Sequence, residues 1–270
     1  MTLISRDTKA QLRIAVMGHD ENPVLDAQAR TLAQQFGLDF IAEPVADVDL
    51  VLAYGEDGLN LRDLRDHRTR PVCIDFTKID IRPHSANLSR RQPLARAMGK
   101  KNTSIIDATA GLGQDAFLLT AMGFQAIAVE RNAVLAALLQ DALSRAQQNS
   151  IVEKVLAGRL SFIYGDARKI VPALDPADVI YLDPMFPPRR SKSALARKEM
   201  RILRDLVGED ADAGQLFEMA HAHARNRVVV KRPQHAKPLI PGPDFALVGK
   251  LVRYDVYLTH ATKSDECFNV

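Results

Sequence analysis

Short apolar segments alternate with amphipathic segments through the second half of the chain. The apolar segments span residues 104–108, 125–130, 160–164, 178–183 and 227–231. Segments with the three- and four-residue apolar spacing of helices lie between them, at residues 114–122, 133–148 and 213–224. Strands that alternate with helices predict a parallel sheet with helices on both of its faces.

The last two apolar segments are so close together that they predict a hairpin. They span residues 246–251 and 254–259, with almost no chain between them. This spacing indicates two antiparallel strands at the edge of the sheet. The predicted α/β domain therefore has a mostly parallel sheet with an antiparallel terminal hairpin.

The first part of the chain predicts a separate, small α/β module. Residues 23–36 have the apolar spacing of a helix that stops at Gly37, and a turn is expected between Gly55 and Gly58. Strands are predicted at residues 12–17, 49–54 and 72–76. We expect the small module at residues 1–82, a basic connecting segment at 83–103 and the catalytic domain at 104–270.

Length and composition fit this organisation and exclude other classes of protein. The 270 residues, 47% of them hydrophobic, can bury one full α/β core and leave roughly a hundred residues for an appendage. Cys73 and Cys267 match neither a disulfide framework nor a metal-ligand spacing, so we expect no metal site and a reducing cytoplasm. No window approaches the ~20 apolar residues that span a bilayer, and no signal peptide is evident, which predicts a soluble protein.

Basic residues gather in two segments, although the formal net charge is only +3. Residues 82–104 contain basic but no acidic side chains. In residues 189–201, Glu199 is the only acidic side chain among several basic ones. Such clusters are typical of surfaces that contact nucleic-acid phosphates, and a solvated helix surface is the alternative. The candidate phosphate contacts are Arg90, Arg91, Arg189, Arg190, Lys192, Lys198 and Lys231.

A glycine loop joins the first predicted strand of the catalytic domain to its helix. Gly111 and Gly113 allow a tight turn and a close approach of the backbone to a ligand, and the helix N-terminus offers free N–H groups. Glu130 ends the next strand, at about the spacing at which an acidic residue accepts hydrogen bonds from ribose hydroxyls. These features predict a site for an adenosine cofactor.

The glycine pattern alone does not identify that cofactor. Residues 111–116 also satisfy G-x-G-x-x-A, the dinucleotide fingerprint of nicotinamide enzymes, and a plain glycine turn is a further alternative. Asp107 favours S-adenosylmethionine (SAM), because a carboxylate just before the loop can face the amino-acid or cationic part of SAM. The further candidate contacts are Asp166 for the adenine amino group, Ala167 through its backbone, and Gln114 and Asp115 for the methionine moiety, with helix capping as a competing role for Asp115.

The octapeptide from Tyr181 to Pro188 directly follows a predicted strand, at the sheet edge where α/β domains bind ligands. It is similar to the [Asp/Asn]-Pro-Pro-aromatic loop of methyltransferases that act on planar nitrogens, with Met185 in place of the second proline. An amine conjugated to a ring is a poor nucleophile, because its lone pair is delocalised, so acceptors must draw its protons out of the ring plane. The Asp183 carboxylate and the Pro184 carbonyl can be these acceptors, and Phe186 offers a face for the target base. A structural proline turn is the alternative.

With these segments the sequence resembles one family, the bacterial ribosomal RNA small subunit methyltransferase J, which is a guanine-N2 methyltransferase. The resemblance rests on RRQPLARAMG (90–99), DATAGLGQDAF (107–117), VERNAVLAALLQD (129–141), YLDPMFPPRRSKSAL (181–195), KEMR (198–201) and RVVVKRP (227–233). It covers most of the chain from about residue 85 onward, whereas the N-terminal module matches much less well. Within this resemblance Met185 is no longer a departure.

The resemblance implies a class I Rossmann-like methyltransferase that uses SAM to methylate N2 of a guanine in 16S ribosomal RNA, within the small ribosomal subunit. It also implies cofactor contacts at Gln114, Asp115, Glu130, Arg131, Asp166, Ala167 and Asp183. Gln114 stands where an arginine is expected, which puts an ionic contact from that position in doubt. Three alternatives stay open: an adenine-N6 methyltransferase acting on nucleic acid, a nicotinamide-dependent oxidoreductase and a non-catalytic RNA-binding module.

Overall fold

The computed structural model describes residues 12–66, 68–185, 202–203, 205–208 and 212–259. The chain divides into two compact units, the first made of Met1–Cys73 and Ser191–Gly208 and the second of Ile74–Arg190 and Glu209–Val270. The domain limits at residues 82 and 103 stay predictions from the sequence. No helix in the described ranges is long and apolar enough to cross a membrane.

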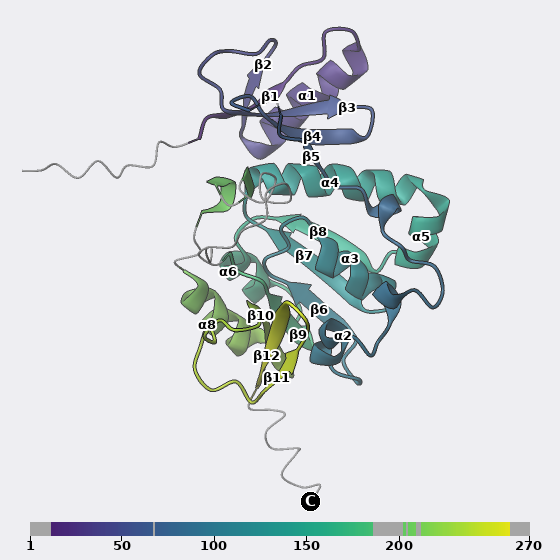
Figure 1. Ribbon diagram of the computed structural model, residues 1–270, viewed down its shortest axis with the longest axis vertical. Helices are drawn as coiled ribbons and strands as arrows, with labels where there is room; N and C mark the ends of the chain where they lie inside the picture. The colour runs from purple at the N-terminus through teal and green to yellow at the C-terminus, as the bar shows by residue number, and fades with distance from the viewer. Residues whose placement is uncertain (1–11, 67, 186–201, 204, 209–211, 260–270) are drawn as a thin grey trace, which may run out of the picture. The chain divides into compact units, whose positions relative to one another are not determined.

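The first unit contains a five-stranded sheet with the strand order β2-β1-β3-β4-β5 (Figure 1). Its strands are β1 (Ile14–Met17), β2 (Asp39–Ile41), β3 (Leu50–Gly55), β4 (Gly58–Asp63) and β5 (Val72–Cys73). The helix α1 (Pro23–Phe36) begins after its Asn22 cap and ends at Gly37, which has a φ of 64°. The structure thus contains the predicted small α/β module, and it adds β2 and β4, which are short or rich in polar residues.

The second unit is built on a seven-stranded sheet with the order β11-β12-β10-β9-β6-β7-β8. Its strands are β6 (Ser104–Asp107), β7 (Gln125–Glu130), β8 (Leu160–Tyr164), β9 (Val179–Leu182), β10 (Arg227–Pro233), β11 (Phe245–Val248) and β12 (Val252–Leu258). The strands from β10 to β8 run parallel, and β12 lies antiparallel between β10 and β11. The predicted mostly parallel sheet with an antiparallel terminal hairpin is confirmed.

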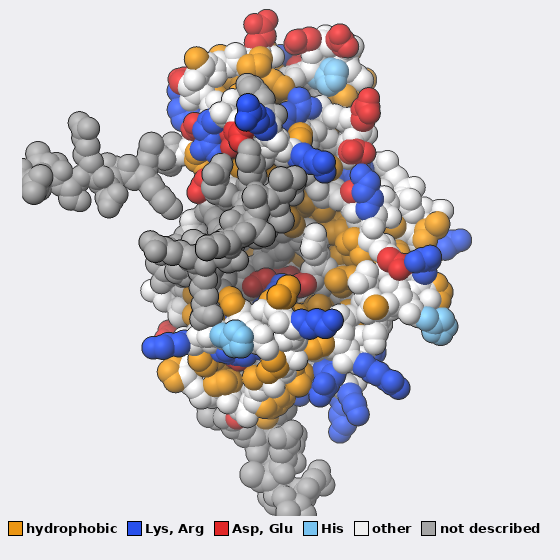
Figure 2. Space-filling model, viewed as in Figure 1, with side chains coloured by type: hydrophobic (Ala, Val, Ile, Leu, Met, Phe, Trp, Pro, Cys, Tyr) orange, Lys and Arg blue, Asp and Glu red, His pale blue; other side chains and the backbone are white. Residues whose placement is uncertain are grey.

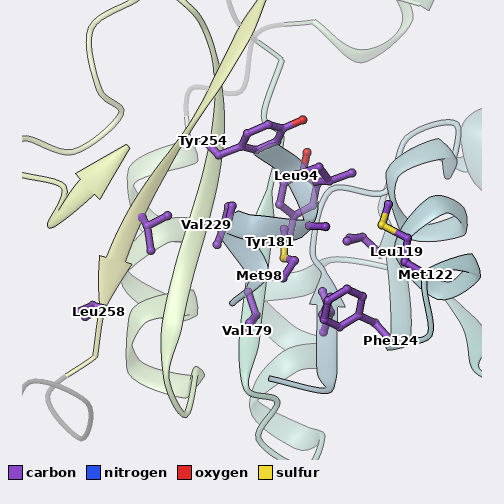
Figure 3. Close-up of a cluster of buried hydrophobic side chains, with 14 residues drawn as sticks. Leu94, Met98, Leu119, Met122, Phe124, Val179, Tyr181, Val229, Tyr254 and Leu258 are labelled. Atoms are coloured by element: carbon purple, nitrogen blue, oxygen red, sulfur yellow. The ribbon is translucent and has the colours of Figure 1, made fainter. Parts of the chain in front are cut away.

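Helices cover both faces of this sheet. Successive side chains of each strand point to opposite faces, so the apolar residues of a strand are buried against helices on both faces. The helices of the described part of the unit are η1 (Phe76–Lys78), η2 (Ala86–Leu88), α2 (Pro93–Met98), α3 (Gln114–Ala121), α4 (Ala133–Gln148), α5 (Ser150–Leu156), α6 (Ala167–Ile170), η3 (Val171–Ala173) and α8 (Ala213–His223). Val179 belongs to the same buried cluster as Leu94 of α2 (Figure 3). Its neighbour Ile180 belongs to a second cluster with Phe217 of α8.

The two loops with predicted chemistry meet at the carboxyl edge of this sheet. β6 lies between β7 and β9, so the order of the strands along the chain reverses between β6 and β9. The register pairs Asp107 with Tyr181, and the N–H of Ala108 donates to the Tyr181 carbonyl at 3.0 Å. Ligands of open α/β sheets bind at such a switch point. The fold therefore places the loops after β6 and β9 side by side.

Candidate active site

Thr109 connects the loop after β6 to the loop after β9. Its N–H donates to the Asp107 carboxylate at 3.1 Å, and its hydroxyl oxygen accepts a hydrogen bond from the N–H of Asp183 at 2.6 Å. The sequence analysis gave Thr109 no role, although it lies inside the predicted cofactor loop. This pair of bonds fixes the start of the reaction loop relative to the cofactor loop.

Gly111 and Gly113 both have positive φ values, but a side chain would meet different surroundings at each. Their φ angles are 56° and 72°, in the region that disfavours residues with a Cβ. A Cβ on Gly113 would come within 2.5 Å of Leu139 on α4, so helix packing requires this glycine. A Cβ on Gly111 would meet nothing closer than the Thr109 carbonyl at 3.9 Å. Of the two glycines, Gly111 therefore has the backbone that a ligand can approach.

Glu130 supports the glycine loop from the end of β7. One carboxylate oxygen accepts a hydrogen bond from the N–H of Gly111, and the other accepts from the N–H of Asn132, each at 2.7 Å. The side chain is buried, and burial raises the pKa of Glu130 above its ordinary value in spite of these bonds. Each carboxylate oxygen has two lone pairs, so the predicted contact with ribose hydroxyls is compatible with this geometry and stays a prediction.

Arg131 and Asp166, two further predicted cofactor contacts, belong to one network of ion pairs. Asp212 contacts Arg131 at 2.6 Å and Arg168 at 2.8 Å. Arg168 in turn contacts Asp166 at 2.6 Å, and its guanidinium lowers the pKa of that carboxyl. Asp166 also caps α6 by accepting the N–H of Arg168, and Ala167 beside it is buried. Neither Arg168 nor Asp212 was predicted from the sequence; Asp212 lies 81 positions from Arg131, so no local pattern connects the two.

The reaction side of the site has an ammonium group between two carboxylates. Lys231 of β10 contacts Asp115 at 2.8 Å and Asp183 at 2.9 Å, and the Tyr181 hydroxyl donates to the same Asp115 oxygen at 2.5 Å. Burial alone would lower the pKa of Lys231, but the two carboxylates outweigh it and raise that pKa. The sequence predicted a phosphate contact for Lys231, whereas the structure directs its ammonium to carboxylates of the site. Asp115 makes no capping hydrogen bond, since the N-cap of α3 is Gly113.

Asp107 ends β6 as a buried carboxyl group, with only 2% of the residue exposed. Burial, followed by the charge of Asp115, raises the pKa of Asp107 well above its ordinary value. Burial and Asp115 also raise the pKa of Tyr254, on β12, to about 12. Figure 3 shows the hydroxyl oxygens of Tyr181 and Tyr254 at the same end of the buried cluster. Both tyrosines therefore complete the reaction side, and the sequence analysis gave neither a role.

Acidic side chains outnumber basic ones where the described strands β6, β7, β9 and β10 end, and Figure 2 shows acidic groups gathered at this part of the surface. The acidic groups are the carboxyls of Asp107, Asp115, Glu130 and Asp183, and the basic groups are Lys231 and Arg131. A negatively charged cradle beside an open glycine backbone suits a cofactor with cationic centres and hydroxyl groups. The same charges oppose the phosphates of a dinucleotide, so these residues fit SAM better.

Several predicted residues lie outside the described part of the chain. They are Phe186, Arg189, Arg190, Lys192 and Lys198. Two neighbours of the reaction site are described: Pro184 is buried directly after β9, and Gln114 is exposed at the start of α3. Asp183 and Pro184, the acceptors of the reaction loop, are thus among the described residues, and the predicted stacking residue is not.

The basic segment before β6 combines a structural contact with an exposed surface. The Arg90 guanidinium donates to the Met122 carbonyl at 2.9 and 3.1 Å and lies 4.5 Å from the centre of the Phe124 ring. These contacts attach the segment to the end of α3. Arg91 is exposed, and Figure 2 shows Lys and Arg side chains gathered where Figure 1 places α2. The phosphate contacts of Arg90 and Arg91 stay predictions.

Comparisons with known proteins agree with this geometry. A family model described as "Putative SAM-dependent methyltransferase" matches residues 31–259. The "Ribosomal RNA small subunit methyltransferase J" of Thioalkalivibrio sulfidiphilus is 42% identical over 94% of this chain and 99% of its own length. The protein of the same name from Pseudomonas savastanoi pv. phaseolicola is 40% identical over 97% of this chain and 96% of its own length. A crystal structure of a SAM-dependent methyltransferase from Neisseria gonorrhoeae has a TM-score of 0.69 and 30% identity, and the match covers 92% of this chain and 96% of that one.

Proposed function

Because the chain belongs to the ribosomal RNA small subunit methyltransferase J family of SAM-dependent methyltransferases, we propose that it methylates the exocyclic N2 of a guanine in 16S ribosomal RNA. The position of Asp183 and Pro184 at the end of β9, beside the glycine loop of β6, carries this proposal. The printed name of the relatives refers to ribosomal RNA of the small subunit. We extend that substrate to this chain, and we take the small subunit in the cytoplasm as its partner.

Family membership confirms SAM as the cofactor and methyl transfer as the class of reaction. It decides between SAM and the nicotinamide dinucleotide that the glycine pattern also allowed. When bound, SAM supplies a methyl group activated by a positively charged sulfur. The residues that we propose to hold it are Asp107, Gly111, Gly113, Gln114, Asp115, Glu130, Arg131, Asp166, Ala167 and Asp183.

These residues divide the recognition of the cofactor between hydrogen bonds and charge. Glu130, fixed by two backbone N–H groups, offers its remaining lone pairs to the ribose hydroxyls. Asp166 accepts the adenine amino group while Arg168 holds its carboxylate in place. The acidic groups at the ends of β6 and β9 favour the cationic sulfur and ammonium. Gly113 contributes by packing against α4, which lets the loop turn into α3.

Asp183 and Pro184 orient the target amine. The lone pair of N2 is delocalised into the guanine ring, so the amine gains nucleophilicity when acceptors draw its protons out of the ring plane. The Asp183 carboxylate and the Pro184 carbonyl supply two acceptors from one rigid turn. Thr109 holds the backbone of Asp183, so the acceptor direction is set before the base arrives. Phe186 follows as the proposed stacking surface, worth roughly 1 to 3 kcal/mol per base.

Transfer of a labelled methyl group to small ribosomal subunits that lack endogenous modification tests this function. The RNA is digested to nucleosides after incubation with the chain and labelled SAM, and N2-methylguanosine is the expected product. N6-methyladenosine would instead support an adenine-N6 methyltransferase. SAM binding without transfer to subunits, free RNA or DNA would support a non-catalytic RNA-binding module. The control is Asp183→Ala, which should fold and transfer no methyl group.

A further inference from the structure

We propose that Lys231 is a positioning residue of the methyl-transfer site, which holds the Asp183 carboxylate ionised and correctly oriented by pairing with Asp183 and Asp115 together. This inference rests on the proposed function, because it gives Lys231 a part in that reaction. It replaces the phosphate contact that the sequence predicts for this lysine.

The sheet places Lys231 next to the reaction loop. β10 runs parallel to β9, and the register pairs Val230 with Leu182, so the next residues along the two strands are Lys231 and Asp183. Asp115 reaches the same ammonium from the first turn of α3. The side chain of Lys231 is only 23% exposed. Lys231 therefore joins α3, β9 and β10 at the point where the reaction loop begins.

The surroundings of Asp183 would oppose its ionisation without this lysine. The ionisable groups that face the Asp183, Asp115 and Lys231 cluster are Asp107 from β6, Tyr181 from β9 and Tyr254 from β12. Neighbouring carboxylates disfavour each other's charge, so one of them takes up a proton unless a cation lies close to both. Lys231 supplies that cation at 2.8 and 2.9 Å.

The ionised form of Asp183 matters because the target amine must donate its protons. An ionised carboxylate only accepts hydrogen bonds, whereas a protonated carboxyl group carries a proton of its own and loses acceptor capacity. A protonated Asp183 would offer the amine a weaker acceptor than the carboxylate does. The Tyr181 hydroxyl holds Asp115 in turn, which fixes the second carboxylate of the pair. Removal of Lys231 should therefore impair turnover more than RNA binding.

The pH dependence of turnover distinguishes this role from a structural one. We would measure kcat and KM for small subunits from about pH 5.5 to about pH 9 in the wild type, Lys231→Met and Lys154→Met. Lys154 is exposed on α5 and serves as the matched control. In Lys231→Met, kcat should fall severalfold at the acidic end and recover as the pH rises, because the acid limb moves up by about two pH units or more, into the measured range. The KM for subunits should stay within about twofold, because no phosphate contact is lost.

Two kinetic outcomes would overturn the inference. A loss of kcat that is equal at every pH would mean that Lys231 only supports the fold. A KM for small subunits that is higher in Lys231→Met and depends less on salt would mean that Lys231 contacts an RNA phosphate. Lys231→Ala gives a second test should the methionine variant fold poorly. Added methylammonium should restore part of its kcat, and no restoration would count against the proposal.

A titration that needs no turnover separates this inference from the proposed function. Carboxyl carbons of aspartate are labelled with ¹³C, and Asp183→Asn assigns the Asp183 signal in the NMR spectrum. That signal should titrate at higher pH in Lys231→Met than in the wild type. An unchanged titration would overturn the role of Lys231 even in an active enzyme. Conversely, a wild type that methylates no RNA would remove the proposed function while the titration still reports on Lys231.

Discussion

The carboxylates on the two sides of the site are held by different kinds of contact. On the cofactor side, Glu130 is held by the N–H of Asn132 and Asp166 by Arg168, each only two positions further along the chain. On the reaction side, Asp115 is held by residues 66 and 116 positions away in the sequence. Each of these two carboxylates on the cofactor side thus has a local contact, to which the longer-range contacts of Gly111 and Asp212 are added, whereas the reaction side exists only when α3, β9 and β10 have come together.

This difference assigns different consequences to damage on the two sides. Local contacts survive small shifts of the sheet, so a change there should affect cofactor affinity and little else. The reaction side depends on three elements at once, so a change there should affect turnover at saturating cofactor. Changes on the two sides should therefore be distinguishable by their effects on SAM affinity and on kcat.

Asp183→Ala should lower kcat about a thousandfold or more, because it removes an acceptor that a preorganised site directs at the amine. The dissociation constant of SAM, measured by calorimetry, should change by a much smaller factor than kcat. Asp183→Asn is the matched control for shape, since it keeps the size of the side chain and replaces one acceptor oxygen by a donor. A loss of SAM affinity as large as the loss of kcat would contradict the separate roles of the cofactor side and the reaction side.

Gly113→Ala should lower the free energy of unfolding by about 2 to 4 kcal/mol, because the new methyl group meets Leu139 and the backbone of the new alanine must keep a positive φ. Gly111→Ala has the φ penalty without the clash and should cost about 1 kcal/mol. Its main effect should be weaker SAM binding, because the methyl group occupies the open space. Chemical denaturation and calorimetry measure the two effects, and equal stability losses would contradict the separate roles.

Asp107→Asn should stabilise the protein more as the pH rises. Burial raises the pKa of Asp107 in the folded state above its unfolded value, so the wild type loses stability as the pH rises through this range. The variant has no charge to bury there. The difference in unfolding free energy, variant minus wild type, should therefore become more positive between about pH 4 and about pH 8. Asp175→Asn, at an exposed position, should show no such trend.

The sequence predicted the fold, but it did not predict the ion pairs that hold the reaction side together. Strand and helix periods placed most elements of the second unit within a few residues, because this unit buries both faces of its sheet. The ribose contact of Glu130 was inferred from its position at the end of a strand and stays a prediction. The ion pair of Lys231 with Asp115 and Asp183 could not be predicted, because it depends on which strands become neighbours. A basic residue after a strand has the same local pattern whether it faces RNA or a carboxylate.

The smallest effect is expected for Arg168→Ala, on the cofactor side. Arg168 holds Asp166 and shares Asp212 with Arg131, but its side chain is 32% exposed, and such ion pairs contribute about 1 kcal/mol or less. SAM should bind about fivefold more weakly, which corresponds to about 1 kcal/mol, while kcat at saturating SAM stays unchanged. Lys169→Ala, exposed on the same helix, is the matched control. A lower kcat at saturating SAM would mean that the ion-pair network also supports the reaction side, and the two sides would then act as one unit.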